Sequence, residues 1–330
     1  MFNISLAPIK YRNVYTSKGG PIKHLEYLKR EIMFGSQNIG YEAYAYLDDS
    51  TSSSIGTTYN LYGNADGQGS DANKITACFK AISEALERQA FKETSLSSQA
   101  NKYGFNIENS TSGLAAFPGI TKYTAKESAN HEAIERWAIT EWWLGNLSIE
   151  EVKYKPESGI HCFQIITPWH PKIVVVLLYR TDASDEAVGV DNNNSQLDLN
   201  RTSFGFAAGN DLSRACKRAE IELMRNHFIL KTKLNSTNSV STNLSHTNND
   251  LSVYERRLLY FSESAGDGFL TFKEQIKKSE NPHNQNHAFP KLLIDAEIVG
   301  EWSKYTTVWR CLYQHQEYKH LENSSDFFYF

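Results

Sequence analysis

Residues 77–88, ACFKAISEALER, contain a spacing of alanine and glutamate that occurs three times in the chain. The spacing is Ala, three residues, Ala, two residues, Glu, two residues, then Glu or Arg. The copies are Ala77, Ala81, Glu84, Glu87; Ala125, Ala129, Glu132, Glu135; and Ala215, Ala219, Glu222, Arg225. Each copy follows a glycine-containing segment, at 63–69, 113–119 and 205–209, which predicts a turn leading into a helix. Three related turn–helix units therefore organise the fold.

On a helix, the two alanines and the first glutamate of each copy share one face, because offsets of 0, 4 and 7 follow the 3.6-residue period. Alanines on that face let another element approach closely. A carboxylate in such a place is costly unless it is paired or bound to a cation. A single Glu-x-x-Glu-Arg is usually a solvated face with local ion pairs, but three copies in one alanine frame favour a shared site. Converging carboxylates and arginines suit Mg²⁺ held against phosphate.

The composition is that of a globular protein. The chain has 330 residues, which allows one large domain or two small ones, and we expect a single domain over residues 1–330. The formal net charge of -4 gives no argument for nucleic acid or an acidic membrane surface as a partner. The N-terminus lacks a signal pattern, and no apolar run reaches membrane-spanning length.

The cysteines are scattered and form no Cys-x-x-Cys pair; they are Cys78, Cys162, Cys216 and Cys311. This pattern favours reduced thiols over a disulfide framework or a zinc site. Together with the absence of a targeting segment, it predicts a cytoplasmic protein.

Hydrophobic periodicity and turn residues predict an α+β chain. Helices are expected at 21–34, 71–92 with Asp71 as N-cap, 124–144, after Phe204 to Lys233, 254–261 and 271–278. Strands are expected at 41–47, 57–62, 160–166, 172–180, 291–298 and 307–314. Residues 233–250 are dominated by Ser, Thr and Asn, which predicts a mobile surface loop.

The three segments resemble the signature regions of YcaO-domain proteins. The first is Gly-Gln-Gly followed by AISEALER (81–88), the second SGLAA (112–116) followed by HEAIER (131–136), and the third SFGFAAG (203–209) followed by RAEIEL (218–223). The resemblance covers roughly residues 15–315. It implies a YcaO-like α+β fold, with mixed sheets packed against helices and three motif helices converging on a nucleotide site.

The resemblance also implies an ATP- and Mg²⁺-dependent enzyme that phosphorylates the oxygen of a peptide backbone amide. Attack by a Cys, Ser or Thr side chain, by sulfide or by an amine then gives an azoline, a thioamide or an amidine. By position, the metal-binding carboxylates would be Glu84, Glu87, Glu132, Glu135 and Glu222. The nucleotide-binding residues would be Lys18, Lys80, Ser112, Arg136 and Arg225. Arg136 and Arg310 would be catalytic.

Several positions depart from the family pattern, and they leave the reaction type open. Lys80 replaces a common serine, Ser112 an asparagine, and Arg225 a glutamine, and the proline-rich C-terminus of azoline-forming members is missing. The alternatives are a non-catalytic YcaO-like scaffold or accessory subunit, and a small-molecule kinase or ligase that uses the same metal site.

The expected partner is the precursor of a ribosomally made, modified peptide such as a bacteriocin. We see no leader-binding segment outside the YcaO-like region, so delivery of the peptide is expected to need a leader-binding (E1-like) or sulfur-donor protein. The sequence leaves open whether the chain forms a homodimer, and it predicts no nucleic-acid or membrane partner.

Overall fold

The structure is a computed structural model, and it describes residues 4–31, 39–48, 65–106, 112–155, 159–167, 172–181, 202–236, 253–262, 266–279 and 290–314. The chain divides into two compact units, Met1–Trp137 with Pro290–Glu317, and Ala138–Phe289 with Tyr318–Phe330. Both combine helices with antiparallel sheets, so the α+β class is confirmed. The single domain over residues 1–330 stays a prediction. Within the described ranges, every helix is too short or too polar to serve as a membrane span.

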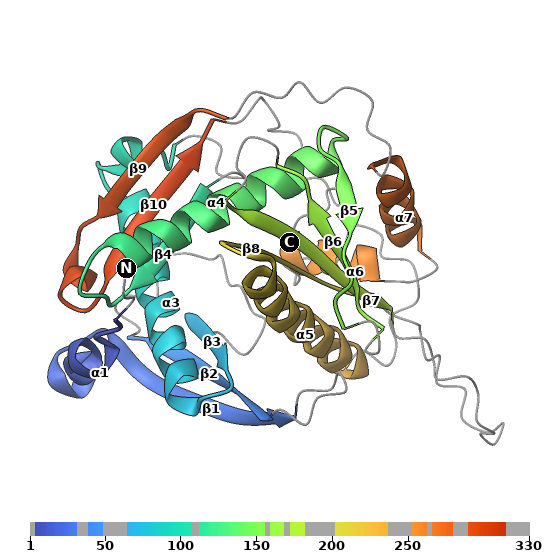
Figure 1. Ribbon diagram of the computed structural model, residues 1–330. Coiled ribbons are helices and arrows are strands. Elements are labelled where there is room, and N and C mark those ends of the chain that lie inside the picture. The colour runs from blue at the N-terminus through green and yellow to red at the C-terminus, as the bar shows by residue number, and fades with distance from the viewer. Residues whose placement is uncertain are drawn as a thin grey trace, which may run out of the picture. The chain divides into compact units, whose positions relative to one another are not determined.

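The first sheet of unit 1 is a three-stranded meander with the order β1-β2-β3. Its strands are β1 (Ile22–Glu31), β2 (Ile39–Leu47) and β3 (Gly67–Asp71), all antiparallel. Helix α3 (Lys74–Ser95) covers one face (Figure 1). Gly67 and Gly69 lie directly under the α3 backbone, and they are paired with Ala45 and Ala43 of β2. Small residues therefore let the helix pack close to the sheet.

The second sheet of unit 1 has the order β4-β10-β9. It joins β4 (Ser112–Phe117) to β9 (Leu292–Ile298) and β10 (Thr307–Tyr313), which come from the far end of the chain. Helix α4 (Tyr123–Trp143) begins in unit 1 and packs its Ala129 against Gly113 of β4. Shorter helices complete the unit: α1 (Ala7–Lys10) and the 3₁₀ turns Tyr11–Asn13, Thr16–Lys18, Ala100–Tyr103 and Glu301–Lys304.

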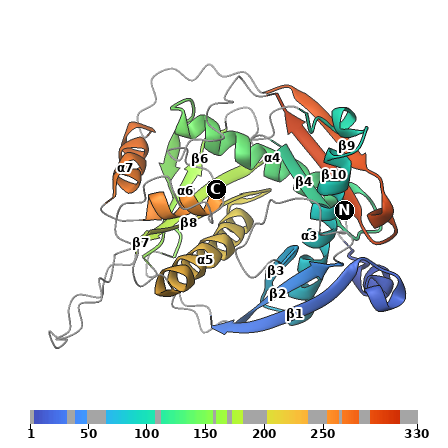
Figure 2. The ribbon, with the colours of Figure 1, turned by 180° about the vertical axis from the view of Figure 1, so that it is seen from behind.

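Unit 2 contains the sheet β5-β6-β7-β8, formed by β5 (Ile149–Glu151), β6 (His161–Ile165), β7 (Val174–Thr181) and β8 (Thr202–Gly209). Helix α5 (Leu212–Ser236) packs against the face that carries Gly205 (Figure 2). Phe204 points to the other face, where its ring contacts Phe272 of α7 (Asp267–Ser279). Helix α6 (Val253–Ser262) packs beside α7. The sheet is thus covered on both faces, which explains the continuous apolar run of β7.

Most of the predicted elements are confirmed within a few residues. These are the strands at 41–47, 160–166, 172–180, 291–298 and 307–314 and the helices at 71–92, 124–144, 254–261 and 271–278. Gly145 follows α4 with a positive φ of 81°, as expected of a helix stop. The predicted strand at 57–62 lies outside the described residues. The predicted loop at 233–250 begins too early, because α5 continues to Ser236; its remainder also lies outside the described residues.

The helix predicted after Pro21 is wrong, because residues 22–31 form strand β1. Ile22, Leu25 and Leu28 have helical spacing, but they do not share one face. Ile22 is fully buried, whereas Leu28 is 51% exposed. The segment instead pairs with β2 from Ile22↔Leu47 to Glu31↔Ile39. Pairing with another strand therefore outweighs a short local pattern, whose fourth member, Ile32, lies outside the described residues.

The N-cap of α3 is Asn73, and the prediction of Asp71 is wrong. The Asn73 side chain accepts hydrogen bonds from the backbone of Ile75 at 2.9 Å and of Thr76 at 3.2 Å, whereas Asp71 ends β3. We expect Asn73→Ala to lower the free energy of unfolding by about 1 kcal/mol, because two N–H groups lose their acceptor. Urea unfolding of this variant and of Asp71→Ala would measure the effect. A larger loss for Asp71→Ala would contradict the assignment.

Candidate functional site

The three alanine–glutamate copies form the same strand–helix joint. The glycines that contact the helices lie in strands β3, β4 and β8, so the prediction of turns is wrong at Gly67, Gly113 and Gly205, whereas residues 63 and 64 of the first segment lie outside the described residues. In each joint, a Cβ added to the strand glycine would lie about 2 Å from the carbonyl oxygen of the second alanine. The pairs are Gly67 with Ala81 (2.1 Å), Gly113 with Ala129 (1.8 Å) and Gly205 with Ala219 (2.1 Å). The glycines thus permit backbone-to-backbone contact between strand and helix.

The first glutamate of each copy accepts a hydrogen bond from the residue that follows this glycine. The bonds run from Gln68 N to Glu84 (3.0 Å), from Leu114 N to Glu132 (2.9 Å) and from Phe206 N to Glu222 (2.8 Å). β3, β4 and β8 each end their sheet, and an edge strand leaves N–H groups without a strand partner. Each glutamate therefore fulfils a structural role at a sheet edge. A carboxylate still has further lone pairs for a ligand.

Two of these glutamates also pair with the arginine one helical turn later. Arg88 lies 2.5 Å from Glu84, and Arg136 lies 2.6 Å from Glu132. The four side chains are between 27% and 37% exposed, so solvent reaches the pairs. Such pairs add little to stability, but they hold two arginines beside two carboxylates.

Glu87 connects the first joint to the second. Its carboxylate accepts a hydrogen bond from Ala116 N of β4 at 3.0 Å. Ala116 is two residues after Leu114, whose N–H donates to Glu132. The pKa of Glu87 is raised well above its ordinary value by burial and by the negative charges of Glu132 and Glu84. Three carboxylates of unit 1 thus lie close enough to repel one another, and a cation would relieve that repulsion.

Arg310 of β10 adds a buried positive charge to this group. Its side chain is 1% exposed, its Nε donates to Tyr103 O at 2.7 Å, and its guanidinium lies 4.0 Å from the centre of the Phe105 ring. Its pKa is lowered to about 10 by burial and by the neighbouring Arg136, while Glu132 opposes that shift. Two arginines beside each other favour an anion between them. We call Glu84, Glu87, Glu132, Arg136 and Arg310 the unit 1 cluster.

The third copy lies in unit 2. Glu222 and Arg225 are on α5, and Glu222 is held by Phe206 N. Asn226 of the same helix donates to Phe204 O at 2.9 Å, and His227 Nδ1 lies 3.2 Å from Ser203 Oγ. The bond from Phe206 N to Glu222 therefore repeats the bonds that Glu84 and Glu132 accept. The convergence of all three helices on one site stays a prediction.

The remaining predicted residues take several environments. Glu135 lies on α4 one turn beyond Glu132, and Ser112 is buried at the start of β4. Lys80 pairs with Asp71 at 2.8 Å and donates to Ser70 O at 2.9 Å. Lys18 ends a 3₁₀ turn, and its amine donates to Arg12 O at 3.1 Å. The contacts described for both lysines are local.

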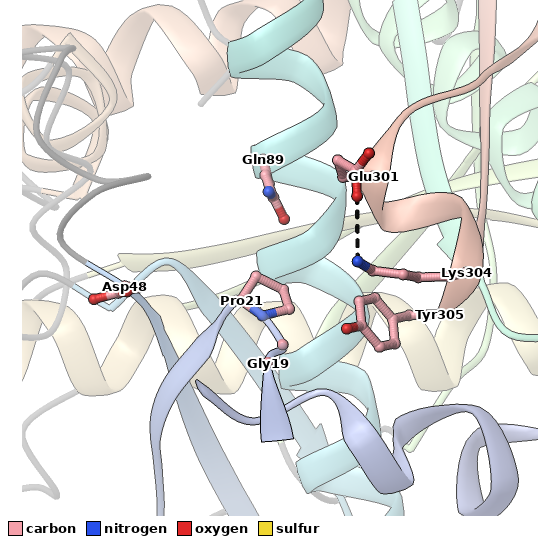
Figure 3. Close-up of a pocket in the computed structure, with 8 residues that line it drawn as sticks. Gly19, Pro21, Asp48, Gln89, Glu301, Lys304 and Tyr305 are labelled. Carbon is pink, nitrogen blue, oxygen red and sulfur yellow. Dashed lines mark hydrogen bonds and ion pairs between the residues drawn. The ribbon is translucent and has the colours of Figure 1, made fainter. Parts of the chain in front are cut away.

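An open pocket of about 190 Å³ lies in unit 1, and sequence reasoning did not find it. It is lined by Gly19, Gly20, Pro21, Asp48, Gln89, Glu301, Lys304 and Tyr305 (Figure 3). Gln89 is two residues after Glu87 and so lies on the other side of α3. Its Nε2 donates to Glu93 at 2.8 Å, whereas its buried Oε1 has no hydrogen-bond partner among the described residues. A water or another donor in the pocket would satisfy this oxygen. The pocket is separate from the unit 1 cluster.

The donor set of the unit 1 cluster fits Mg²⁺ and phosphate in chemical type. Carboxylate oxygens suit Mg²⁺, and arginine suits phosphate oxygens. Among the described residues, no three Asp, Glu, His or Cys side chains are arranged to hold a metal ion by themselves. Mg²⁺ commonly keeps several waters and is held by one or two carboxylates together with substrate phosphates. The cluster therefore suits a metal that enters with a nucleotide.

Comparison with solved structures finds similarity to a YcaO structure. No protein-family model matches the sequence, and no curated protein matches it. The structure of YcaO from Methanopyrus kandleri bound with AMPPCP and Mg²⁺ aligns with 92% of this chain and 87% of that chain, with a TM-score of 0.46 and 15% sequence identity. The function proposed below rests on the geometry of the unit 1 cluster and on the sequence motifs.

Proposed function

We propose that the chain is an ATP- and Mg²⁺-dependent enzyme of the YcaO type that activates backbone amides of a peptide. The observation that carries the proposal is the unit 1 cluster, in which glutamates of two separate motifs meet beside two arginines. Glu84 and Glu132 are each paired with an arginine, whereas the pKa of Glu87 stays raised by burial and by their negative charges. Strongly perturbed carboxylates beside charged partners are typical of functional sites.

The side chains suggest a division of roles. Glu87, Glu84 and Glu132 would hold the metal ions, with Glu135 and Glu222 completing the set. Arg136 and Arg310 would bind phosphate oxygens, and Arg310 is held rigidly for that purpose by Tyr103 O and the Phe105 ring. Lys18, Lys80, Ser112 and Arg225 are proposed as further nucleotide contacts. ATP supplies the phosphoryl group that turns an amide oxygen, a poor leaving group, into a good one.

The finer assignment follows from the motifs alone. We propose a cytoplasmic enzyme that makes an azoline, thioamide or amidine in a ribosomally made peptide. Its proposed partners are the precursor peptide and a leader-binding or sulfur-donor protein. The mass change of the peptide distinguishes the products: loss of water indicates an azoline, and replacement of oxygen by sulfur indicates a thioamide.

Calorimetric titration with ATP tests the proposal directly. We expect binding in the presence of Mg²⁺ and much weaker binding in EDTA. Glu132→Gln should weaken Mg²⁺-dependent binding at least about tenfold, because one carboxylate ligand and the partner of Arg136 are lost together. Gln can still accept the bond from Leu114 N, so the fold should remain. A chain that shows no heat and no thermal shift with ATP and Mg²⁺ is not this enzyme.

A non-catalytic scaffold is the second candidate, because the first glutamate of each copy already has a structural role at a sheet edge. A scaffold would keep these glutamates without using ATP. Cells that carry the Glu84→Gln, Glu132→Gln double variant distinguish the two functions. Full production of the modified peptide supports the scaffold, and its loss with a folded variant supports the enzyme.

A further inference from the structure

Two buried cysteines of unit 2 touch one another. Cys162 lies on β6 and Cys216 on α5, 54 residues apart in sequence, and their Sγ atoms are 3.6 Å apart. Each residue is 1% exposed. All four cysteines of the chain are within the described residues, and all are free thiols. Cys162 and Cys216 thus differ from Cys311, which is equally buried but has the Asp295 carboxylate beside its sulfur.

We infer that Cys162 and Cys216 form a redox-active dithiol that a hydroperoxide converts into a disulfide. Sulfurs in contact need only a small adjustment of the side chains to reach bonding distance. Helix α5 packs on the sheet that contains β6, which keeps the two sulfurs facing each other. The contact therefore defines a modification site in unit 2, separate from the unit 1 cluster.

The two sulfurs have different surroundings, which give them different roles in the reaction. The hydrogen bond between the two thiols lowers the pKa of Cys216, while burial and Glu220 oppose that shift. The pKa of Cys162 is raised, chiefly by Cys216. The direction of these shifts favours Cys216 as the thiolate that attacks first. Tyr154 lies beside both sulfurs, with its hydroxyl bonded to Glu220 at 2.6 Å.

The reaction balances in two steps. The Cys216 thiolate attacks the hydroperoxide O–O bond and becomes a sulfenic acid, and the other oxygen leaves as an alcohol or water after taking up a proton. Cys162 sulfur then attacks the Cys216 sulfur, the S–O bond breaks, and water leaves with the Cys162 proton. Two thiols are oxidised and one peroxide is reduced.

The disulfide would fasten α5 to the sheet of unit 2. Cys216 is six residues before Glu222 on the same helix. The bond would close a loop of 54 residues, and the loss of chain entropy in the unfolded state should raise the melting temperature of this unit by roughly 10 °C. Oxidation would therefore restrain the helix that carries the third motif.

Peptide mapping of the full chain tests the inference. The reduced protein is treated with hydrogen peroxide, alkylated with N-ethylmaleimide in denaturant, and digested without reductant. We expect the Cys162 and Cys216 peptides to be recovered as one cross-linked pair, two hydrogens lighter than their sum and separable by dithiothreitol. Cys311 should remain alkylated as a buried control. The melting temperature should rise in the wild type and not in Cys162→Ser.

Trapping with dimedone tests the order of attack. In Cys162→Ser, the sulfenic acid should accumulate on Cys216, and in Cys216→Ser little adduct should form on Cys162. The inference is wrong if both thiols remain alkylatable once the more exposed Cys78 is oxidised. It is also wrong if either thiol forms its disulfide with Cys78 or Cys311.

Discussion

Glu87→Gln is expected to stabilise the ligand-free protein and to weaken its Mg²⁺-dependent nucleotide binding strongly. Burial disfavours the charged form of this carboxylate in the folded chain, and the nearby charges of Glu132 and Glu84 disfavour it further. Glutamine removes the charge and can still accept the hydrogen bond from Ala116 N. We expect the melting temperature at neutral pH to rise by about 2–4 °C, the shift produced by ~1 kcal/mol in a protein of this size.

The stabilisation should depend on pH in one direction. A raised pKa means that the folded state binds the Glu87 proton more tightly than the unfolded state. The wild type therefore loses stability as the pH rises from the ordinary glutamate pKa of 4.5 through the raised value. Glu87→Gln lacks this loss, so the two melting curves should coincide below that window and separate above it.

Thermal melts between pH 4 and pH 8, with calorimetry at neutral pH, measure both effects. Glu93→Gln is the matched control, because Glu93 is exposed on the same helix and bonds only to Gln89 in the contacts described. It should leave nucleotide binding unchanged, whereas Glu87→Gln should weaken it by on the order of 100-fold or more. Unchanged binding in Glu87→Gln would contradict the role of the cluster in holding metal and nucleotide.

The sequence predicted the helices of the site better than its strands. The alanine–glutamate spacing located α3, α4 and α5, because a close-packed helix face imposes a strict period on the residues it carries. It also indicated that Glu84 lies on the close-packed face of its helix, and in the structure Glu84 accepts the bond from Gln68 N. The meeting of Glu87 with β4 could not be read from α3 alone, since it depends on the position of a strand from another joint.

The glycine segments were misassigned because glycine commonly marks a turn. Here the signal is a glycine placed 14 to 16 residues before the second alanine of each copy, as for Gly67 and Ala81. Glycine at this place leaves room for a helix backbone. Strand β1 was missed for a different reason. Its formation depends on pairing with β2, and the hydrophobic periodicity of a single segment contains no information about pairing.

Among substitutions that add one methyl group to the site, Gly113→Ala is expected to destabilise the protein most. The new Cβ would lie 1.8 Å from Ala129 O and 2.6 Å from Ala133 N, both backbone atoms of α4. A helix backbone cannot rotate away as a side chain can, so β4 and α4 must separate. We expect the free energy of unfolding to fall by about 3 kcal/mol, which lowers the melting temperature by roughly 5–10 °C. Urea unfolding and thermal melts measure it.

Gly209→Ala provides the matched control, because it adds the same methyl group where the nearest atom, Ala215 N, is 3.1 Å away. Neither glycine has a positive φ, so backbone strain does not contribute. The control should lose less than about 1 kcal/mol of unfolding free energy. Alanine also restricts the unfolded chain, and this effect partly offsets the cost of the tighter contact. Gly113→Ala should also weaken nucleotide binding, because separating β4 from α4 breaks the bond from Leu114 N to Glu132. Equal stability losses at the two positions would show that the close strand–helix approach does not set the geometry of the cluster.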